Sequence, residues 1–135
     1  MTDNELSTEI IGAALEVHRA LGPGLLEGIS EECLAIELDC RGVPFERQQR
    51  VSLEYTGQRV AADLRLDMII DGRIIVEPKA VETLLPVHGA QLLSYRRRTG
   101  KSLGLLINCN VPLLRDGITR IVDNCSDRRA SAPLR

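Results

Sequence analysis

Residues 64–79 read LRLDMIIDGRIIVEPK, and this stretch decides the fold. Two runs of β-branched and apolar residues flank a turn signal that contains glycine, which is typical of a β-hairpin. A two-residue turn at Asp71 and Gly72 is the first candidate for such a loop, but it would mix charged and apolar side chains on both faces. A loop with an odd number of residues, for example three with Gly72 in the left-handed conformation, separates them. The hydrophobic pattern therefore predicts the odd loop.

The odd loop gives the hairpin one wholly apolar face, formed by Leu66, Met68, Ile70, Ile74, Val76 and Pro78. Opposed residues of an antiparallel pair share a face, so Asp67, Glu77 and Lys79 gather on the other face, with Ile69 and Ile75 beside them. Asp63 shares that face too. Regular pairing would place it ~13 Å along the strand from Asp67, so we expect Asp63 to pair with Arg65 or to meet solvent.

Length and composition favour a soluble, cytoplasmic protein. The chain of 135 residues can bury the core of one domain, and an apolar content of 44% with three aromatic residues predicts an aliphatic core. The net charge of −2 requires any nucleic-acid-binding surface to be local. Four cysteines without a C-x-x-C pair or a zinc-like spacing indicate reduced thiols. We see no secretory signal and no apolar run near the ~18 residues of a membrane span, so no membrane association is expected.

Helices are expected over residues 7–21, 25–41 and 87–99, each followed by glycine. Ser7 or Thr8 is the expected cap of the first helix. The predicted buried stripe of the second is Leu25, Ile29, Cys33, Ile36 and Cys40. The buried strand 103–108 follows the third helix, which implies a right-handed crossover and parallel pairing with the second hairpin strand. Residues 1–122 are thus expected to form a single α/β or α+β domain with a mixed central sheet flanked by helices, and residues 123–135 a flexible tail.

Asp67 and Glu77 on adjacent strands can hold a hard divalent cation. Magnesium prefers oxygen ligands and is typically held by one or two carboxylates, and the backbone carbonyl of Pro78 could add a third oxygen. The metal would polarise a phosphoryl oxygen, while Lys79 could orient or deprotonate the attacking water. An ion-pair network of the same charged residues on a solvated sheet face fits the residue types equally well.

Two further groups of residues are candidates for contacts to a substrate. Gln91 and Tyr95 lie one helical turn apart, where they could position water or a phosphate. Affinity for nucleic acid should come from the run Arg96, Arg97 and Arg98, with Arg47 and Arg50 as additions. A solvated charge run is the more frequent meaning of such a cluster, and three arginines also complement the C-terminus of a helix.

The pattern of Asp67 followed by Glu77-x-Lys79 after a hydrophobic strand resembles the signature of the PD-(D/E)xK nuclease superfamily. The resemblance is closer to one branch, the small GxxExxY proteins. It extends over residues 6–122 and includes the segments 21–27, 31–34, 77–81, 84–88, 90–95, 105–108 and 111–118.

This resemblance implies a restriction-endonuclease-like αβββαβ core and a magnesium-dependent nuclease, with manganese as a substitute ion. Asp67 and Glu77 then look like metal ligands, Lys79 like the catalytic amine, Glu27 like the acid of the first helix of the core, and Gln91 like the polar residue of its second helix. The implied partner is nucleic acid, DNA more than RNA. A domain this small would need a second copy to span a duplex, so a homodimer is expected.

Two positions depart from the pattern of the branch. Ser30 stands where the branch has its tyrosine, and Pro78 replaces the usual aliphatic residue between Glu77 and Lys79. Proline cannot donate to a ladder and is unusual in a central strand, and catalytic sites are sensitive to shifts of ~1 Å. The alternatives to a nuclease are therefore a catalytically inactive binding or regulatory module with the nuclease fold, and a metal-free scaffold.

Overall fold

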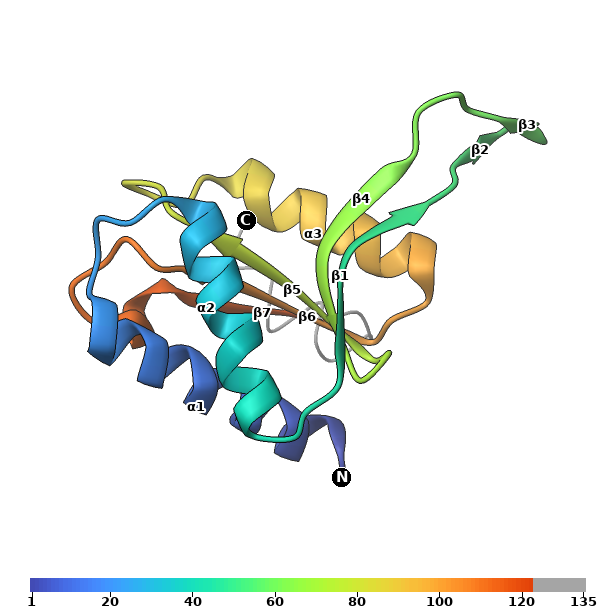
Figure 1. The fold of residues 1–135 in the computed structure, drawn as a ribbon. Helices are drawn as coiled ribbons and strands as arrows, with labels where there is room; N and C mark the ends of the chain where they lie inside the picture. The colour runs from blue at the N-terminus through green and yellow to red at the C-terminus, as the bar shows by residue number, and fades with distance from the viewer. Residues whose placement is uncertain (123–135) are drawn as a thin grey trace.

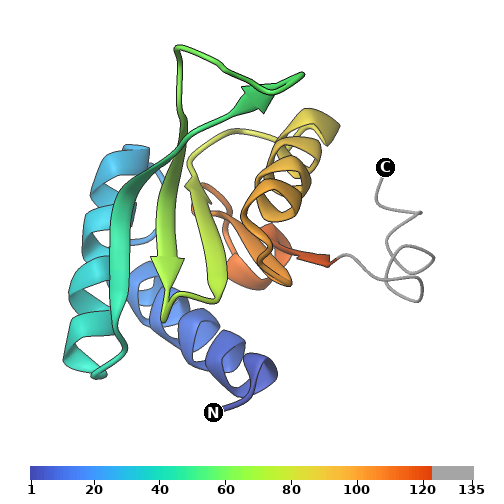
Figure 2. The ribbon, with the colours of Figure 1, turned by 90° about the vertical axis from the view of Figure 1, so that its right-hand side faces the viewer.

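The computed structural model describes residues 1–122, and the expected flexible tail at 123–135 lies outside the described residues. In chain order the elements are α1 (Asp3–Leu21), α2 (Glu27–Cys40), β1 (Phe45–Val51), β2 (Glu54–Tyr55), β3 (Gln58–Arg59), β4 (Leu64–Ile70), β5 (Ile74–Lys79), α3 (Pro86–Thr99), β6 (Leu103–Asn108), the 3-10 helix η1 (Leu114–Gly117) and β7 (Ile118–Val122). A mixed sheet in the order β1-β4-β5-β6-β7 lies between α1 and α2 on one face and α3 on the other (Figures 1 and 2). The expected mixed α/β class is confirmed.

The central hairpin has the odd loop. Ile70 pairs with Ile74 and Met68 with Val76, so residues 71–73 form a three-residue turn. Asp71 and Gly72 both have positive φ, 52° and 65°, and glycine adopts this conformation without steric cost. Strand β5 then pairs in parallel with β6 through the α3 crossover, as expected. Together these pairings make β5 the central strand of the sheet.

Two apolar clusters lie on the two faces of the sheet. Met68, Ile70, Ile74 and Val76 belong to the larger cluster, which includes apolar residues of α1 and α2. Leu66 is an exception to the predicted face, since it packs with the smaller cluster on the α3 side, formed by Leu66, Ile69, Ile75, Leu92 and Leu106. The side chains of β4 therefore do not alternate strictly between the two faces of the sheet. The alternation fails between Leu66 and Met68, where the ladder from β4 to β5 ends.

Helix α2 presents a different face to the core than its sequence predicted. Its buried residues are Ser30, Glu31, Leu34, Ala35 and Leu38, whereas Ile29 and Ile36 of the predicted stripe are 44% and 57% exposed. The buried Glu31 carboxylate accepts hydrogen bonds from Arg47 Nε (2.9 Å) and Gln48 Nε2 (3.0 Å) of β1. A buried charge is tolerated when it is paired and hydrogen-bonded in this way, so partners in β1 determine which face of α2 is buried.

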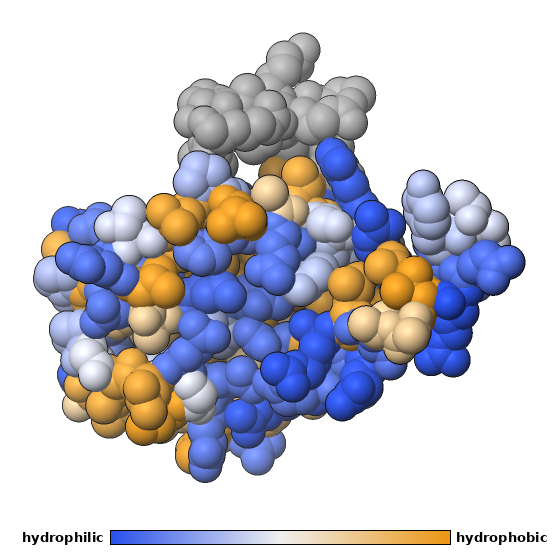
Figure 3. All heavy atoms as spheres, turned by 90° about the horizontal axis from the view of Figure 1, so that it is seen from above, coloured by the Kyte–Doolittle hydropathy of each residue, from blue (hydrophilic) through white to orange (hydrophobic). Residues whose placement is uncertain are grey.

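A two-stranded arm, β2 and β3, projects beyond the sheet between β1 and β4 (Figure 1). The chain leaves the arm after Arg59, where β3 ends, and β4 begins at Leu64. Asp63 lies in this break and pairs with Arg59 (3.5 Å) rather than with Arg65. In the view from above, hydrophilic residues occupy the middle of the molecule and hydrophobic ones form separate patches around it (Figure 3).

Helix α1 begins earlier than expected. The Thr2 hydroxyl accepts from the Glu5 N–H, and the Glu5 carboxylate accepts from the Thr2 N–H, so a capping box at Thr2 replaces the predicted cap at Ser7 or Thr8. Gly100 directly follows α3, as expected, and adopts the left-handed conformation. Among residues 1–122, no helix is long and apolar enough to cross a membrane.

Candidate active site

The candidate site begins where β4 and β5 part. The last pair of their ladder is Met68 with Val76, whereas β5 stays paired with β6 as far as Lys79 and Asn108. The Lys79 carbonyl accepts from the Cys109 N–H (2.8 Å) on the β6 side. Because successive residues of a strand direct their backbone groups to opposite sides, the carbonyl of Pro78 and its missing N–H both lie on the β4 side. Pro78 thus ends the ladder to β4 and leaves the pairing that positions Lys79 intact.

A pocket of about 510 Å³ opens at this point. Its lining includes six of the residues singled out in the sequence: Glu27, Asp67, Glu77, Lys79, Gln91 and Tyr95. They come from α2, β4, β5 and α3, so four elements build one site. The remaining lining residues are Arg50, Asp63, Leu64 and Arg65. Asp63 was expected to lie too far from Asp67 to join the site. It lines the same pocket because the break before β4 ends the regular pairing on which that expectation rested.

The Glu77 carboxyl group is the most buried of the acidic groups that line the pocket. Its residue is only 6% exposed, and its Oε1 is buried without a hydrogen-bond partner in the described structure. The pKa of Glu77 is raised to about 8, chiefly by burial and to a smaller extent by the hydrogen bond with the Asp67 carboxyl group and by its charge. The charge of Lys79 acts in the opposite direction. Two carboxyl groups in contact cannot both ionise without cost, and the charge of Lys79 offsets this cost only in part.

These donors fit a hard divalent ion. Among residues 1–122, no group of three or more His, Cys, Asp or Glu side chains could together hold a metal. Magnesium, in contrast, is commonly held by one or two carboxylates and keeps several waters. Asp67 and Glu77, with the Pro78 carbonyl directed toward the β4 side, supply such a set, and the buried Oε1 of Glu77 has no other partner.

The polar residues from the helices also meet in the pocket. Gln91 Nε2 donates to the Tyr95 hydroxyl (2.8 Å) one turn along α3. Glu27, the first residue of α2, accepts from the Ala80 N–H (3.3 Å) just beyond Lys79. A carboxylate in the first turn of a helix also interacts favourably with the helix dipole. Glu27 therefore stabilises the start of α2 and contacts the chain at the end of β5.

Asn108 anchors the chain directly after Lys79, a role that the sequence did not indicate. Its carboxamide donates to the Val81 carbonyl (2.9 Å) and accepts from the Val81 N–H (3.1 Å). It also accepts from the Asn110 N–H (3.2 Å), and the residue is 2% exposed. The backbone on either side of Ala80 is therefore fixed by β6, which keeps the Lys79 side chain at a defined place on the pocket wall.

Replacing Asn108 should destabilise this end of the sheet. Asn108→Ala leaves the part-buried N–H and carbonyl of Val81 without their partners, which should lower the free energy of unfolding by about 2–3 kcal/mol. Urea denaturation measures this loss. Asn110→Ala is the matched control, because Asn110 accepts one exposed hydrogen bond from the Gly24 N–H and its loss should cost less than about 1 kcal/mol. Equal losses in both variants would contradict the anchoring role of Asn108.

The predicted arginine surface is only partly formed. Arg96 is 2% exposed and cannot contribute to a phosphate-binding surface as expected, because it lies one turn after the buried Leu92 on the side of α3 that faces the sheet. Arg97 and Arg98 are exposed. Arg47 forms an ion pair with the buried Glu31, so it does not contribute to a phosphate-binding surface either.

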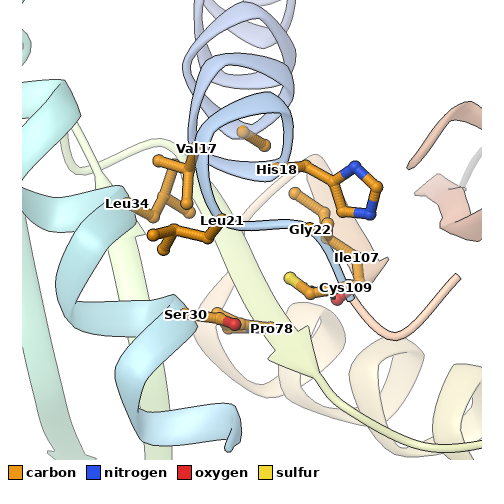
Figure 4. A pocket seen from close by; sticks show the side chains of 10 residues that line it. Val17, His18, Leu21, Gly22, Ser30, Leu34, Pro78, Ile107 and Cys109 are labelled. Atoms are coloured by element: carbon orange, nitrogen blue, oxygen red, sulfur yellow. Dashed lines mark hydrogen bonds between the residues drawn. The ribbon is translucent and has the colours of Figure 1, made fainter. Parts of the chain in front are cut away.

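The two departures from the branch pattern lie together. Ser30 of α2 and Pro78 of β5 both line a cavity of about 20 Å³ between the sheet and helices α1 and α2 (Figure 4). This is room for about one water molecule. Cys109 lines the same cavity. Burial raises the pKa of the Cys109 thiol, and a hydrogen bond with Ser30 partly offsets this rise. Ser30 is not among the residues that line the site pocket, so this position lies behind β5 rather than in the polar pocket.

A sequence profile of the PD-(D/E)XK nuclease superfamily matches residues 4–121. The match covers nearly all of the chain, and the five-stranded mixed sheet flanked by helices is consistent with the restriction-endonuclease-like fold. The protein belongs to the PD-(D/E)XK nuclease superfamily. No curated protein matches the chain. The expectation drawn from Asp67 and Glu77-x-Lys79 is thereby confirmed at the level of the superfamily.

Proposed function

We propose that this protein is a magnesium-dependent nuclease that hydrolyses phosphodiester bonds of DNA, and that it belongs to the GxxExxY branch of its superfamily. The observation that carries the proposal is the pocket in which Asp67, Glu77 and Lys79 meet. It contains a buried carboxylate oxygen without a partner in a chain whose superfamily is that of nucleases. Action in the cytoplasm and a homodimer that spans a duplex are parts of the same proposal.

Five side chains of the pocket have roles in this reaction. Hydrolysis adds water across a P–O bond, so the water loses a proton and the leaving oxygen gains one. Asp67, Glu77 and the Pro78 carbonyl would hold the ion, which when bound would polarise the phosphoryl oxygen and stabilise the developing charge. Lys79 orients the attacking water or accepts its proton. Gln91 and Tyr95, already joined by a hydrogen bond, position the phosphate.

The direct test is cleavage of labelled single-stranded, duplex and branched DNA, and of RNA, by the purified protein with magnesium or manganese. Cleavage should require the metal and should be abolished by Asp67→Ala and by Lys79→Ala. Absence of any cleavage that both substitutions abolish would overturn the enzymatic role. Metal binding that persists without cleavage, and that Glu77→Ala removes, would instead support the inactive binding or regulatory module. Sedimentation of the protein, free and with duplex, tests the homodimer.

A further inference from the structure

Arg50 of β1 and Arg65 of β4 are directly opposed across their antiparallel pair. Opposed side chains share a face with their Cβ atoms ~5 Å apart, and like charges in this arrangement destabilise a sheet. Both residues are exposed, and both line the pocket that contains Asp67 and Glu77. The sheet therefore keeps two guanidinium groups together at a place where they repel each other.

The other arginines of this ribbon have carboxylate partners. Arg47 Nε lies 2.9 Å from Glu31 Oε2, and Arg59 lies 3.5 Å from Asp63 Oδ1. Among residues 1–122, none of the ion pairs or side-chain hydrogen bonds includes Arg50 or Arg65. The acidic groups of the pocket do not neutralise these two side chains, so their donors remain available to a ligand.

We propose that Arg50 and Arg65 form an anion site for a phosphodiester group of the nucleic-acid strand, next to the group held at Asp67, Glu77 and Lys79. Guanidinium groups match phosphate oxygens with paired hydrogen bonds, and a shared phosphate removes their mutual repulsion. The identification of the polymer rests on the proposed function.

The place of the pair along β4 supports a neighbouring phosphate rather than the reacting one. Arg65 precedes Asp67 by two residues, which is ~7 Å along a strand. This separation is of the same scale as that of adjacent phosphates in a polynucleotide. The pair also lies at the base of the projecting β2–β3 arm (Figure 1), so the site directs the bound strand toward the arm. The exposed Arg97 and Arg98 of α3 do not line the pocket.

Binding of a fluorescein-labelled DNA oligonucleotide, single-stranded and duplex, tests the site by anisotropy over a series of salt concentrations. EDTA in the buffer prevents cleavage. Each phosphate contact contributes ~0.7–0.9 to the slope of log K against log salt. Because the two arginines share one phosphate, Arg50→Gln/Arg65→Gln should reduce the slope by about 0.7–0.9. The matched control, Arg19→Gln/Arg115→Gln, removes the same charge from exposed positions outside the pocket and should leave the slope unchanged. An unaltered slope in the first variant, or an equal loss in the control, would overturn the anion site.

A second measurement separates this role from a structural one. Because the pair is repulsive, Arg65→Gln should raise the midpoint of urea denaturation at low salt, and Arg65→Glu, which places an opposite charge beside Arg50, should raise it further. Both variants should bind the oligonucleotide more weakly. A lowered midpoint together with weaker binding would assign Arg65 a structural role and overturn the proposal.

The outcome for the anion site is independent of the outcome for catalysis. Cleavage by the unsubstituted protein with no dependence of the salt slope on Arg50 and Arg65 would leave the nuclease and remove the anion site. A slope that depends on the pair, in a protein that never cleaves, would leave the anion site and remove the nuclease.

Discussion

Lys79→Met is expected to reduce phosphodiester cleavage by about 10²–10⁴-fold while leaving manganese binding close to that of the unsubstituted protein. The ammonium group lines the pocket beside Glu77, and its charge lowers the pKa of that carboxyl group. Its removal takes away the group proposed to orient or deprotonate the attacking water but none of the oxygen donors. Asp67→Asn, in contrast, removes a carboxylate from the proposed ligand set and should weaken both cleavage and metal binding.

The chain offers a matched control for this experiment because it has only two lysines. Lys101 lies outside the pocket and donates from Nζ to the Gly72 carbonyl (2.7 Å), so Lys101→Met removes the same group from another place and should retain cleavage. Calorimetry with manganese and a cleavage assay on the same preparations separate the two effects. Retained cleavage in Lys79→Met would exclude Lys79 as the catalytic amine, and lost metal binding in that variant would indicate that its main role is to organise the site.

The hairpin was predictable because its charges allow only one register. A two-residue loop would have placed Glu77 and Lys79 on an apolar face, so the pattern of residues 64–79 excluded it, and the observed pairing of Ile70 with Ile74 agrees. The contact between Asp67 and Glu77 followed from the same register. The register of the hairpin could be predicted because the residues that determine it lie close together in the sequence.

What could not be predicted depends on partners far along the chain. The buried face of α2 is fixed by the hydrogen bonds of Glu31 with Arg47 and Gln48, and α2 has apolar residues on several sides, so its own pattern was ambiguous. Arg96 is buried within a run of three arginines because α3 turns about 100° per residue, and the run itself contains no sign of which member faces the sheet. The pairing of Arg50 with Arg65 required the register of β1 with β4.

Glu77→Gln is expected to stabilise the metal-free fold at alkaline pH, although it should abolish activity. The pKa of Glu77 is raised from 4.5 to about 8, chiefly by burial. Between these two values the folded state binds more protons at this site than the unfolded state, so the contribution of Glu77 to the free energy of unfolding falls as pH rises. The loss begins above about pH 4.5 and is complete above about pH 8. A glutamine cannot ionise, so the variant should lack this fall and should exceed the unsubstituted protein by on the order of 2–4 kcal/mol at pH 8.5.

Urea denaturation in EDTA at several pH values between about 5 and 8.5 measures this difference, and Glu32→Gln at an exposed position of α2 is the control. A difference between the two proteins that does not change with pH would contradict the shift. Saturating magnesium at alkaline pH should then reduce or reverse the order of stability, because an ion that binds only the folded state stabilises it by RT ln(1 + [L]/Kd), and Glu77→Gln removes a charged ligand. The same buried carboxylate that costs stability in the absence of metal therefore becomes, on this proposal, the source of the affinity for it.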